Sequence, residues 1–552
     1  MSGGVFFLEN HEKKGGKMTL DNKAVAAPRA GRREWIGLAV LALACVLYSM
    51  DLTVLHLAVP RLSADLQPSS AQLLWIVDIY GFMVAGSLIM MGTLGDRIGR
   101  RRLLLIGASA FGVASVLAAF STSAEMLIAT RALLGLAGAT LAPSTLSLIR
   151  NMFLDPHQRT VAIGVWITSF SVGGAIGPLL GGAMLQFFWW GSVFLLAVPV
   201  MAVLLVLGPV LLPEFRDPDA GRPDAASVAL SLVAVLSVIF GLKQIAQDGI
   251  GMLPALSIAC GICVGVMFVR RQKRLADPLI DVRLFRRPAF SASLVTFTLA
   301  IFAMFGTFLY IAQYLQLVVG LSPLMAGVWM LPQSVGFIAG SMLAPAIVRR
   351  FRPASVMGAG LTLTALGLGI LAQVEGTSGL TLLVTGSVVM SLGLGPVFTL
   401  GTDLIISAAP PERAGAASGI SETSAEFGGA LGIAVLGSIG TAVYRSELAD
   451  VVPTALPPRA AEAARDTLGG ALTVAKQLPG PEGGALVDAA HAAFTQGVRL
   501  TAAIGCVLMI AVAVFAARML RRLPAAASDG KGQSDLEATA AEDVLNPAPA
   551  KA

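Results

Sequence analysis

Four acidic residues lie inside segments of this chain that are otherwise apolar and long enough to cross a membrane; they are Asp51, Asp78, Glu422 and Glu426. Ionising a side chain at the centre of a bilayer costs at least about 2.5–3.5 kcal/mol, so such residues usually mark paths for ions or substrates. A buried carboxyl group can hold a proton or balance the charge of a bound cation. Arg131 lies in a similar apolar segment and needs an anionic partner. We expect that partner to be Asp51, because both residues fall in the outer half of their segments.

Glu422 and Glu426 are four residues apart, which places them on one face of a helix. At 1.5 Å per residue they lie roughly 12 and 18 Å from the inner end of their segment, near the middle of a bilayer. Two like charges this close cannot both ionise cheaply, so we expect at least one to hold a proton. The pair is therefore predicted to carry protons and to bind a cationic substrate. The alternative is a hydrogen-bonded helix contact in which both acids stay protonated.

The elements that must position these residues are membrane-spanning helices. The chain has 552 residues, of which 55% are apolar and 13% charged, whereas average proteins are about 25% charged. A helix needs about 20 apolar residues to cross the hydrocarbon core. Fourteen runs meet this requirement, at 35–59, 72–94, 103–122, 126–149, 161–185, 191–212, 226–245, 252–269, 290–315, 325–348, 354–373, 379–406, 414–442 and 498–517. The sequence predicts an all-α polytopic membrane protein.

The distribution of basic residues predicts that both termini are cytoplasmic. Most of the 39 Lys and Arg then fall in cytoplasmic tails and loops, as the positive-inside rule expects. The external loops hold Arg61, Lys243, Arg445, Arg459, Arg465, Lys476 and Arg499. The net charge of +6 is expected to face anionic lipid rather than nucleic acid. The N-terminal stretch lacks the apolar core of a signal peptide, so we expect the first span to stay uncleaved, with Met18 as an alternative start.

An internal repeat divides the spans into two halves. Glycines 173, 174 and 177 recur at 428, 429 and 432, at a constant offset. This alignment predicts six spans, a two-span insert and six further spans, an arrangement typical of rocker-type transporters with a substrate site between the halves. The predicted divisions are a cytoplasmic tail (1–34), an N-terminal half (35–212), an insert with a basic loop (213–289), a C-terminal half (290–522) that includes an external segment (445–496), and a disordered tail (523–552).

The loop after the second span carries Gly92, Asp96, Arg97, Gly99 and Arg100 within an eleven-residue pattern. Gly99 permits a tight turn, and Asp96 can form a charge network with the arginines that locks two helices in one conformation. The pattern resembles the signature loop of the major facilitator superfamily. That resemblance implies that these five residues act as a conformational switch.

Three further motifs strengthen the resemblance. The segment from Arg131 to Gly138 is similar to the second motif of the superfamily, which implies a role for Arg131 in proton transfer. The run with Gly173, Gly177 and Pro178 resembles a motif of exporters that exchange substrate for protons, which implies a role in conformational change. The segment from Met50 to Pro60 resembles the signature of fourteen-helix drug:proton antiporters of the QacA/EmrB-like group, with His56 where Asn is usual. The resemblance implies the major facilitator fold.

Further candidates for substrate binding join the two glutamates. They are Asp78, Gln333, Phe305 and Tyr310, of which the aromatic rings can stack with lipophilic cations. His56 is expected to be a polar residue at the outer end of its helix, with a proton relay as the alternative. Lys243 and Asp248 are expected to be solvated beside an external loop. Residues 459–476 are expected to form short amphipathic helices, either as a cap or as a passive connector.

These features predict a proton-coupled exporter of amphipathic, mainly cationic compounds in the bacterial cytoplasmic membrane. We expect it to act as a monomer, with protons and a small-molecule substrate as partners and with no cofactor. The soluble segments contain no phosphate-binding loop of the G-x-x-x-x-G-K-[ST] type, so ATP is not the expected energy source. The alternative within transport is a dedicated exporter of one metabolite or antibiotic. A membrane enzyme is not expected, because the four His form no catalytic set on one loop.

Overall fold

The computed structural model describes residues 29–216, 224–275, 278, 280, 282–376, 379–409, 414–449, 452, 456–478 and 481–520. Nearly all of these residues are helical, and no β-strand occurs among them. The tail predicted to be disordered, 523–552, lies outside the described residues. We call the end of the molecule at which helix α1 begins the inner end, and the end at which it finishes the outer end.

The helices of the first half are α1 (Arg32–Leu66), α2 (Ser70–Ile98), α3 (Arg100–Ala119), α4 (Ala124–Gly138), α5 (Leu141–Met152), α6 (Pro156–Phe187), α7 (Ser192–Leu195) and α8 (Ala197–Leu211). The insert consists of α9 (Ala225–Asp248) and α10 (Met252–Gln272), and the 3₁₀ turn η1 (Leu284–Arg286) follows it. The second half contains α11 (Pro288–Gln313), the π-helical turn η2 (Tyr314–Val318), α12 (Pro323–Val348), α13 (Pro353–Leu371), α14 (Leu380–Ser407), α15 (Ala414–Leu448), α16 (Pro458–Asp466), α17 (Leu468–Ala475) and α18 (Pro481–Leu520).

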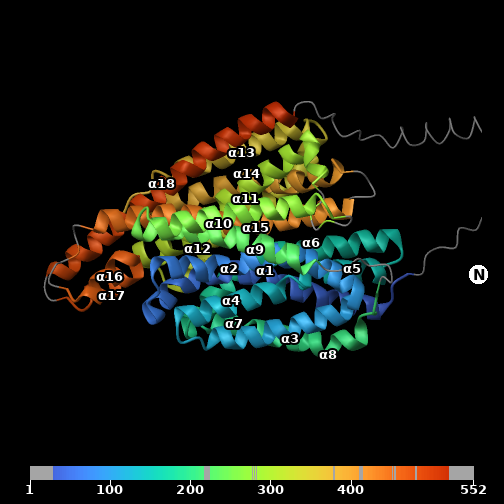
Figure 1. Cartoon of the computed structure of the whole chain (residues 1–552), viewed down its shortest axis with the longest axis horizontal. Helices are drawn as coiled ribbons and strands as arrows, with labels where there is room; N and C mark the ends of the chain where they lie inside the picture. The colour runs from blue at the N-terminus through green and yellow to red at the C-terminus, as the bar shows by residue number, and fades with distance from the viewer. Residues whose placement is uncertain are drawn as a thin grey trace, which may run out of the picture.

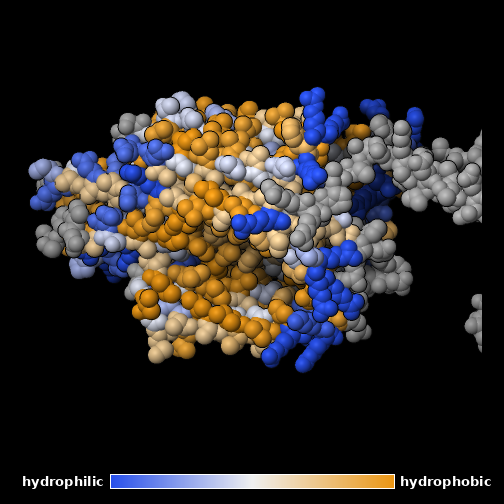
Figure 2. Space-filling model, turned by 90° about the horizontal axis from the view of Figure 1, so that it is seen from above, coloured by the Kyte–Doolittle hydropathy of each residue, from blue (hydrophilic) through white to orange (hydrophobic). Residues whose placement is uncertain are grey.

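Fourteen helical segments of the described chain are long and apolar enough to cross a membrane, which confirms the predicted number. The space-filling view shows an apolar band between hydrophilic ends, as a bilayer requires (Figure 2). In Figure 1 the first six spans lie in the lower part of the bundle, the last six lie in the upper part, and α9 and α10 cross the middle. The two halves meet mainly through α2 with α15 and α6 with α12.

The fourth span differs from the continuous helix expected over 126–149. It is broken into α4 and α5 at Ala139 and Thr140. Pro143 has no amide hydrogen, so it cannot donate to the carbonyl of Ala139 as a continuous helix requires. The Thr140 hydroxyl instead donates to the carbonyl of Ala137 at 2.7 Å.

Helical structure continues into the predicted external segment 445–496 from both sides, because α15 reaches Leu448 and α18 begins at Pro481. Buried apolar residues at helical spacing extend α18 well before the predicted start of the last span; they are Leu486, Ala490, Ala493 and Phe494. Between these helices lie α16 and α17, as expected for 459–476. They occupy the left end of Figure 1, and α17 packs on both α1 and α18. The short helices therefore contact both halves at the outer end.

The described contacts between the halves lie in the outer part and the middle of the spans. The Gln316 side chain of α11 donates to the carbonyl of Leu57 on α1 at 3.0 Å. A Cβ added to Gly182 of α6 would lie 2.6 Å from the carbonyl oxygen of Pro323 on α12. Toward the inner end, no hydrogen bond or ion pair between the described residues joins the two halves. The hydrogen bonds that join the two halves among the described residues therefore lie in the outer part and the middle of the spans.

Candidate functional site

Asp51 and Arg131 form the predicted buried pair. The Arg131 guanidinium donates to Asp51 at 2.7 Å, and both side chains are almost fully buried. The Nε of Arg131 also donates to the carbonyl of Ile76 at 3.2 Å, and its guanidinium lies 4.7 Å from the centroid of the Tyr80 ring. A buried charge is tolerated only when it is paired and hydrogen-bonded, and Arg131 meets both conditions. Protonation of Asp51 would remove the charge that balances Arg131.

Glu426 makes a hydrogen bond that joins the two halves. It accepts a bond from the Tyr48 hydroxyl at 2.7 Å, with Tyr48 on α1 and Glu426 on α15. Glu422 lies one turn toward the inner end on the same face. Both glutamates are partly exposed although they lie in the middle of a span. The contact with Tyr48 places Glu426 toward α1 of the opposite half rather than toward lipid.

Aromatic residues connect the two acidic centres. The ring centroids of Tyr48 and Tyr80 are 6.3 Å apart, and Tyr80 in turn lies under the guanidinium of Arg131. The Tyr80 hydroxyl is buried without a hydrogen-bond partner. Contacts therefore run without a break from Asp51 through Arg131 and two tyrosines to Glu426. Through these contacts, a change of charge at Asp51 can alter the electrostatic environment of Glu426, and the reverse.

An aromatic wall lies beside this path. The Phe170 ring of α6 meets Tyr48 edge to face at 5.8 Å and Trp166 at 4.8 Å. On the opposite side, the predicted residue Phe305 of α11 is partly buried and packs against Gly429, close to the level of Glu426. Aromatic faces beside a carboxylate suit a lipophilic cation. Phe305 therefore stays a candidate for substrate binding.

The other predicted substrate residues do not join the glutamates. The Tyr310 hydroxyl donates to the carbonyls of Leu436 and Gly437, so it ties α11 to α15. Gln333 on α12 is buried, and its Oε1 has no partner. Asp78 is bound to Lys243 of the insert at 2.8 Å. Within the part of the chain that the structure describes, no hydrogen bond or ion pair links these three side chains to Glu422 or Glu426, because their helix faces turn toward other neighbours.

Two expectations about polar residues near the outer surface are wrong. Lys243 was expected to be solvated, but its side chain is 1% exposed because Asp78 and the Trp75 ring enclose it. His56 was expected at a helix end, but it is 1% exposed and both ring nitrogens lack partners, because α1 continues to Leu66. The side chain of Asp248 is outside the described residues. Although the charge count placed Lys243 with the external loops, the residue falls within the predicted run 226–245, and this position was the signal that it needed an acidic partner.

The loop between α2 and α3 holds the expected charge network. Asp96 accepts from Arg100 at 2.5 Å and 2.7 Å. Gly99 has φ +112°, and a Cβ there would collide with the carboxylate of Glu214, which accepts from the Arg101 amide at 3.2 Å. A residue with a side chain could not adopt this turn. The sequence offered no signal for Glu214, which follows α8.

Two other residues of the predicted switch have few contacts. Arg97 is exposed. A Cβ added to Gly92 would meet only Pro143, at 3.9 Å, so the space around Gly92 would admit alanine. The network that the structure shows therefore rests on Asp96, Arg100 and the turn at Gly99.

The glycine motif of α6 is a packing surface between helices. A Cβ on Gly173 would overlap the backbone of Val46 on α1, and one on Gly177 would overlap Thr53 of the same helix. On another face of α6, the carbonyl of Pro178 lies against Gly327 of α12, in the other half. The motif therefore sits where α6 meets both its own half and the opposite one. Small residues permit this close approach of helices.

The described residues contain no group of three His, Cys, Asp or Glu side chains placed to hold a metal ion. Buried acids paired within a bundle of two six-span halves are the features of a secondary transporter. A family model described as Major Facilitator Superfamily matches residues 41–433, which is more than half of the chain. The chain belongs to the major facilitator superfamily. Its fourteen spans agree with the fourteen-helix group that its motifs resemble.

Known members of the superfamily match most of the chain. The multidrug efflux pump LfrA of Mycolicibacterium smegmatis is 44% identical over 494 residues, covering 90% of this chain and 98% of LfrA. The methyl viologen resistance protein SmvA of Salmonella typhimurium is 36% identical over 496 residues, covering 88% of this chain and 98% of SmvA. The tetracenomycin C resistance and export protein of Streptomyces glaucescens is 34% identical, covering 87% of this chain and 91% of that protein.

A solved structure shares the fold. The bacterial homologue of the human lysosomal transporter Spinster, in an inward-facing and unoccupied conformation, has a TM-score of 0.63 and 18% sequence identity. The match covers 89% of this chain and 98% of that chain. At this identity the likeness concerns the fold alone. The chain is a multi-pass membrane transporter of the superfamily, with a small-molecule substrate.

Proposed function

We propose that this protein exports amphipathic, mainly cationic compounds in exchange for protons. The observation that carries the proposal is the pair of partly exposed glutamates, Glu422 and Glu426, in the middle of a span and next to aromatic rings. An ionisable acid at this depth costs free energy, so such a residue usually marks a functional site. The names of the relatives LfrA and SmvA, a multidrug efflux pump and a methyl viologen resistance protein, support cationic drugs as substrates.

The proposed cycle begins in the inward-facing state. A cation binds between the halves and is balanced by an ionised glutamate, with Tyr48 holding Glu426 in place. The halves then rock to face outward, where protons load a glutamate and Asp51. Protonation removes the charge that held the cation, which leaves. Return to the inward-facing state restores the bond between Asp51 and Arg131 as the proton departs.

The energy for export comes from proton movement in this scheme. Each proton that moves inward gains about 2.3 kcal/mol per 100 mV of membrane potential, and the pH gradient adds to this. Proton and substrate compete for the same carboxyl groups, so each must weaken the binding of the other. We further propose that the protein works as a monomer in the bacterial cytoplasmic membrane, with the inner end and both termini in the cytoplasm, and that it needs no cofactor.

The test is ethidium efflux from cells and membrane vesicles with a proton gradient that can be collapsed. We expect wild-type efflux to stop when the gradient collapses, and Asp51→Asn, Glu422→Gln and Glu426→Gln to lose proton-driven efflux. Asp403→Asn is the matched control, because Asp403 is an exposed acid on α14, away from the site. Efflux that continues without a gradient, or full activity in all three site variants, contradicts the proposal.

A dedicated exporter of one metabolite is the second candidate. It is favoured by the resemblance to the tetracenomycin C resistance and export protein, which is 34% identical. The same vesicles distinguish the two functions. A dedicated exporter would leave ethidium and other organic cations inside and export a single neutral or anionic compound.

A further inference from the structure

The two-helix insert lies across the line where the two halves meet. Helix α9 packs on α2 of the N-terminal half and on α15 of the C-terminal half, as its central position in Figure 1 shows. A single apolar cluster contains Phe82 of α2, Ile239 of α9, and Ala430 and Ala434 of α15. The insert therefore covers the seam between α2 and α15, which is one of the two main contacts between the halves.

The contact of α9 with α2 includes a buried ion pair. The Nζ of Lys243 lies 2.9 Å from Oδ1 and 2.8 Å from Oδ2 of Asp78, and both side chains are at most 1% exposed. The same ammonium group lies 3.7 Å from the centroid of the Trp75 ring, which is also on α2. Separating these groups would leave two buried charges without partners. The contact of α9 with α15 in the cluster is apolar and can slide without such a loss.

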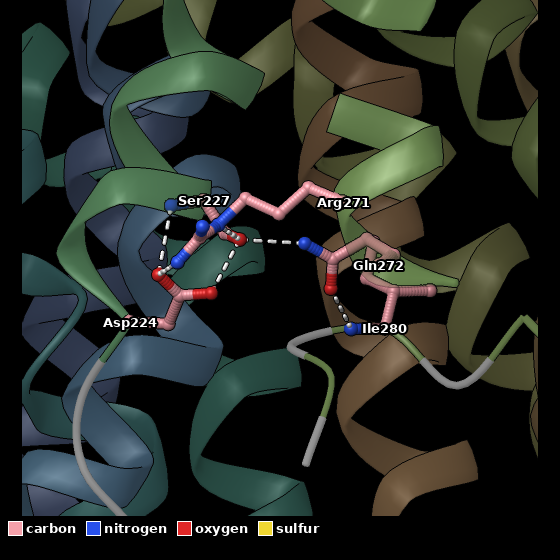
Figure 3. Close-up of polar contacts among 5 residues, drawn as sticks. All are labelled: Asp224, Ser227, Arg271, Gln272 and Ile280. Atoms are coloured by element: carbon pink, nitrogen blue, oxygen red, sulfur yellow. Dashed lines mark hydrogen bonds and ion pairs between the residues drawn. The ribbon is translucent and has the colours of Figure 1, made fainter. Parts of the chain in front are cut away.

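The two helices of the insert are joined by hydrogen bonds at their inner ends and pack closely against each other. At its inner end, Asp224 caps α9 by accepting from the amide of Ser227 at 3.1 Å, and it accepts from Arg271 of α10 at 2.9 Å (Figure 3). The Gln272 side chain donates to the Ser227 hydroxyl at 2.6 Å. Farther from the inner end, a Cβ added to Gly261 of α10 would lie 2.6 Å from the carbonyl oxygen of Ala234 on α9, so the backbones of the two helices are in close contact.

We propose that Lys243 fastens the insert to α2, so that the hairpin moves with the N-terminal half while α15 slides past it. A rigid body in contact with two halves that rock against each other must stay with one of them. The buried ion pair keeps the insert with α2, since opening that contact would leave Lys243 and Asp78 buried without a partner. Lys243 is thus a positioning residue, and Asp78 is its anchor rather than a ligand of the substrate. The inference rests on the proposed function only in requiring the halves to move.

Crosslinking tests which half carries the insert. All variants are made in a chain whose native cysteines, Cys45, Cys260, Cys263 and Cys506, are replaced. One pair of new cysteines, at Gly86 and Leu232, joins α2 to α9 where the side chain of Leu232 contacts Gly86. The other pair, at Ile239 and Ala434, joins α9 to α15 within the shared cluster. With a short thiol crosslinker we expect efflux to survive the first link and to stop with the second. Any other pattern overturns the proposal.

Charge substitutions test the anchor. Lys243→Met leaves Asp78 buried alone, so we expect a lower melting temperature in detergent and a loss of efflux of roughly tenfold or more. The double variant Asp78→Asn with Lys243→Gln removes both charges and is expected to recover stability and efflux together. Lys273→Met is the control, since Lys273 is exposed at the inner end of α10.

Two results would overturn the assignment. One is a Lys243→Met protein with normal stability and efflux. The other is a double variant that is as stable as the wild type but inactive, because the charges would then act in transport rather than as a fastening. Melting temperature and crosslinking yield do not depend on the substrate. A failure of the proposed function, seen as no export of any organic cation by the wild type, is therefore distinguishable from a failure of the anchor.

Discussion

The hydrogen bond between Tyr48 and Glu426 is expected to favour the inward-facing state. It is 2.7 Å long, it is shielded from solvent on the side of Tyr48, and it joins α1 of one half to α15 of the other. A net hydrogen bond contributes about 0.5–1.5 kcal/mol when both groups are neutral and about 1.5–3 kcal/mol when one is charged. Removing it with Tyr48→Phe should therefore shift the balance of states toward the outward-facing one.

The size of the shift follows from these energies. Since about 1.4 kcal/mol corresponds to a factor of ten, a neutral bond predicts a change of roughly twofold to tenfold, and a bond to an ionised Glu426 up to about a hundredfold. The measurement is the alkylation rate of a cysteine placed at Leu74 in a chain without other cysteines. Leu74 is buried against Gly437 at the outer seam and becomes accessible only when that seam opens. We expect Tyr48→Phe to raise the rate by these factors.

Two controls make the test specific. Tyr444→Phe loses a buried hydrogen bond to the carbonyl of Ala464, which lies within the C-terminal half, so the rate should not change. Glu426→Gln keeps a carbonyl oxygen that can accept from Tyr48, so its effect should be smaller than that of Tyr48→Phe. An unchanged or slower alkylation rate in Tyr48→Phe would refute the reasoning that this bond holds the halves in the inward-facing state.

Two further predictions concern packing and the inner end of the insert. Gly173→Leu should abolish efflux because a side chain there overlaps the backbone of Val46, whereas Gly164→Leu, with no atom within 4 Å of an added Cβ, should remain active in the same assay. Equal activity would contradict the packing argument. At Asp224, burial opposes ionisation, but hydrogen bonds from Arg271 and Ser227 outweigh it and lower the pKa below its usual value of 3.8. The bonds therefore stabilise the protein above that pH and lose their effect as the pH falls through the lowered pKa. Asp224→Asn should lower the melting temperature at pH 7, with a gap from wild type that closes toward pH 3; a constant gap would contradict this.

Local features of the sequence were enough to predict the spans and several contacts. The number of spans follows from apolar length, because each helix must cross the same thickness of hydrocarbon. The ion pair between Asp96 and Arg100 was predictable because the two residues are only four positions apart in the same loop motif. The pairing of Asp51 with Arg131 was predictable because a buried charge needs a partner and the depth of each residue can be counted from the end of its span.

The sequence alone also determined how deep each acid lies in its span, but only the tertiary structure decided which acids share a site. Depth follows from length along a helix, whereas the neighbour of a side chain depends on how the helix is rotated about its axis and which helix packs beside it. Close contacts at glycines such as Gly177 and Gly81 set that rotation, and they involve residues far apart in sequence. For this reason Asp78 meets Lys243 of the insert, and Glu426 meets Tyr48 of the opposite half.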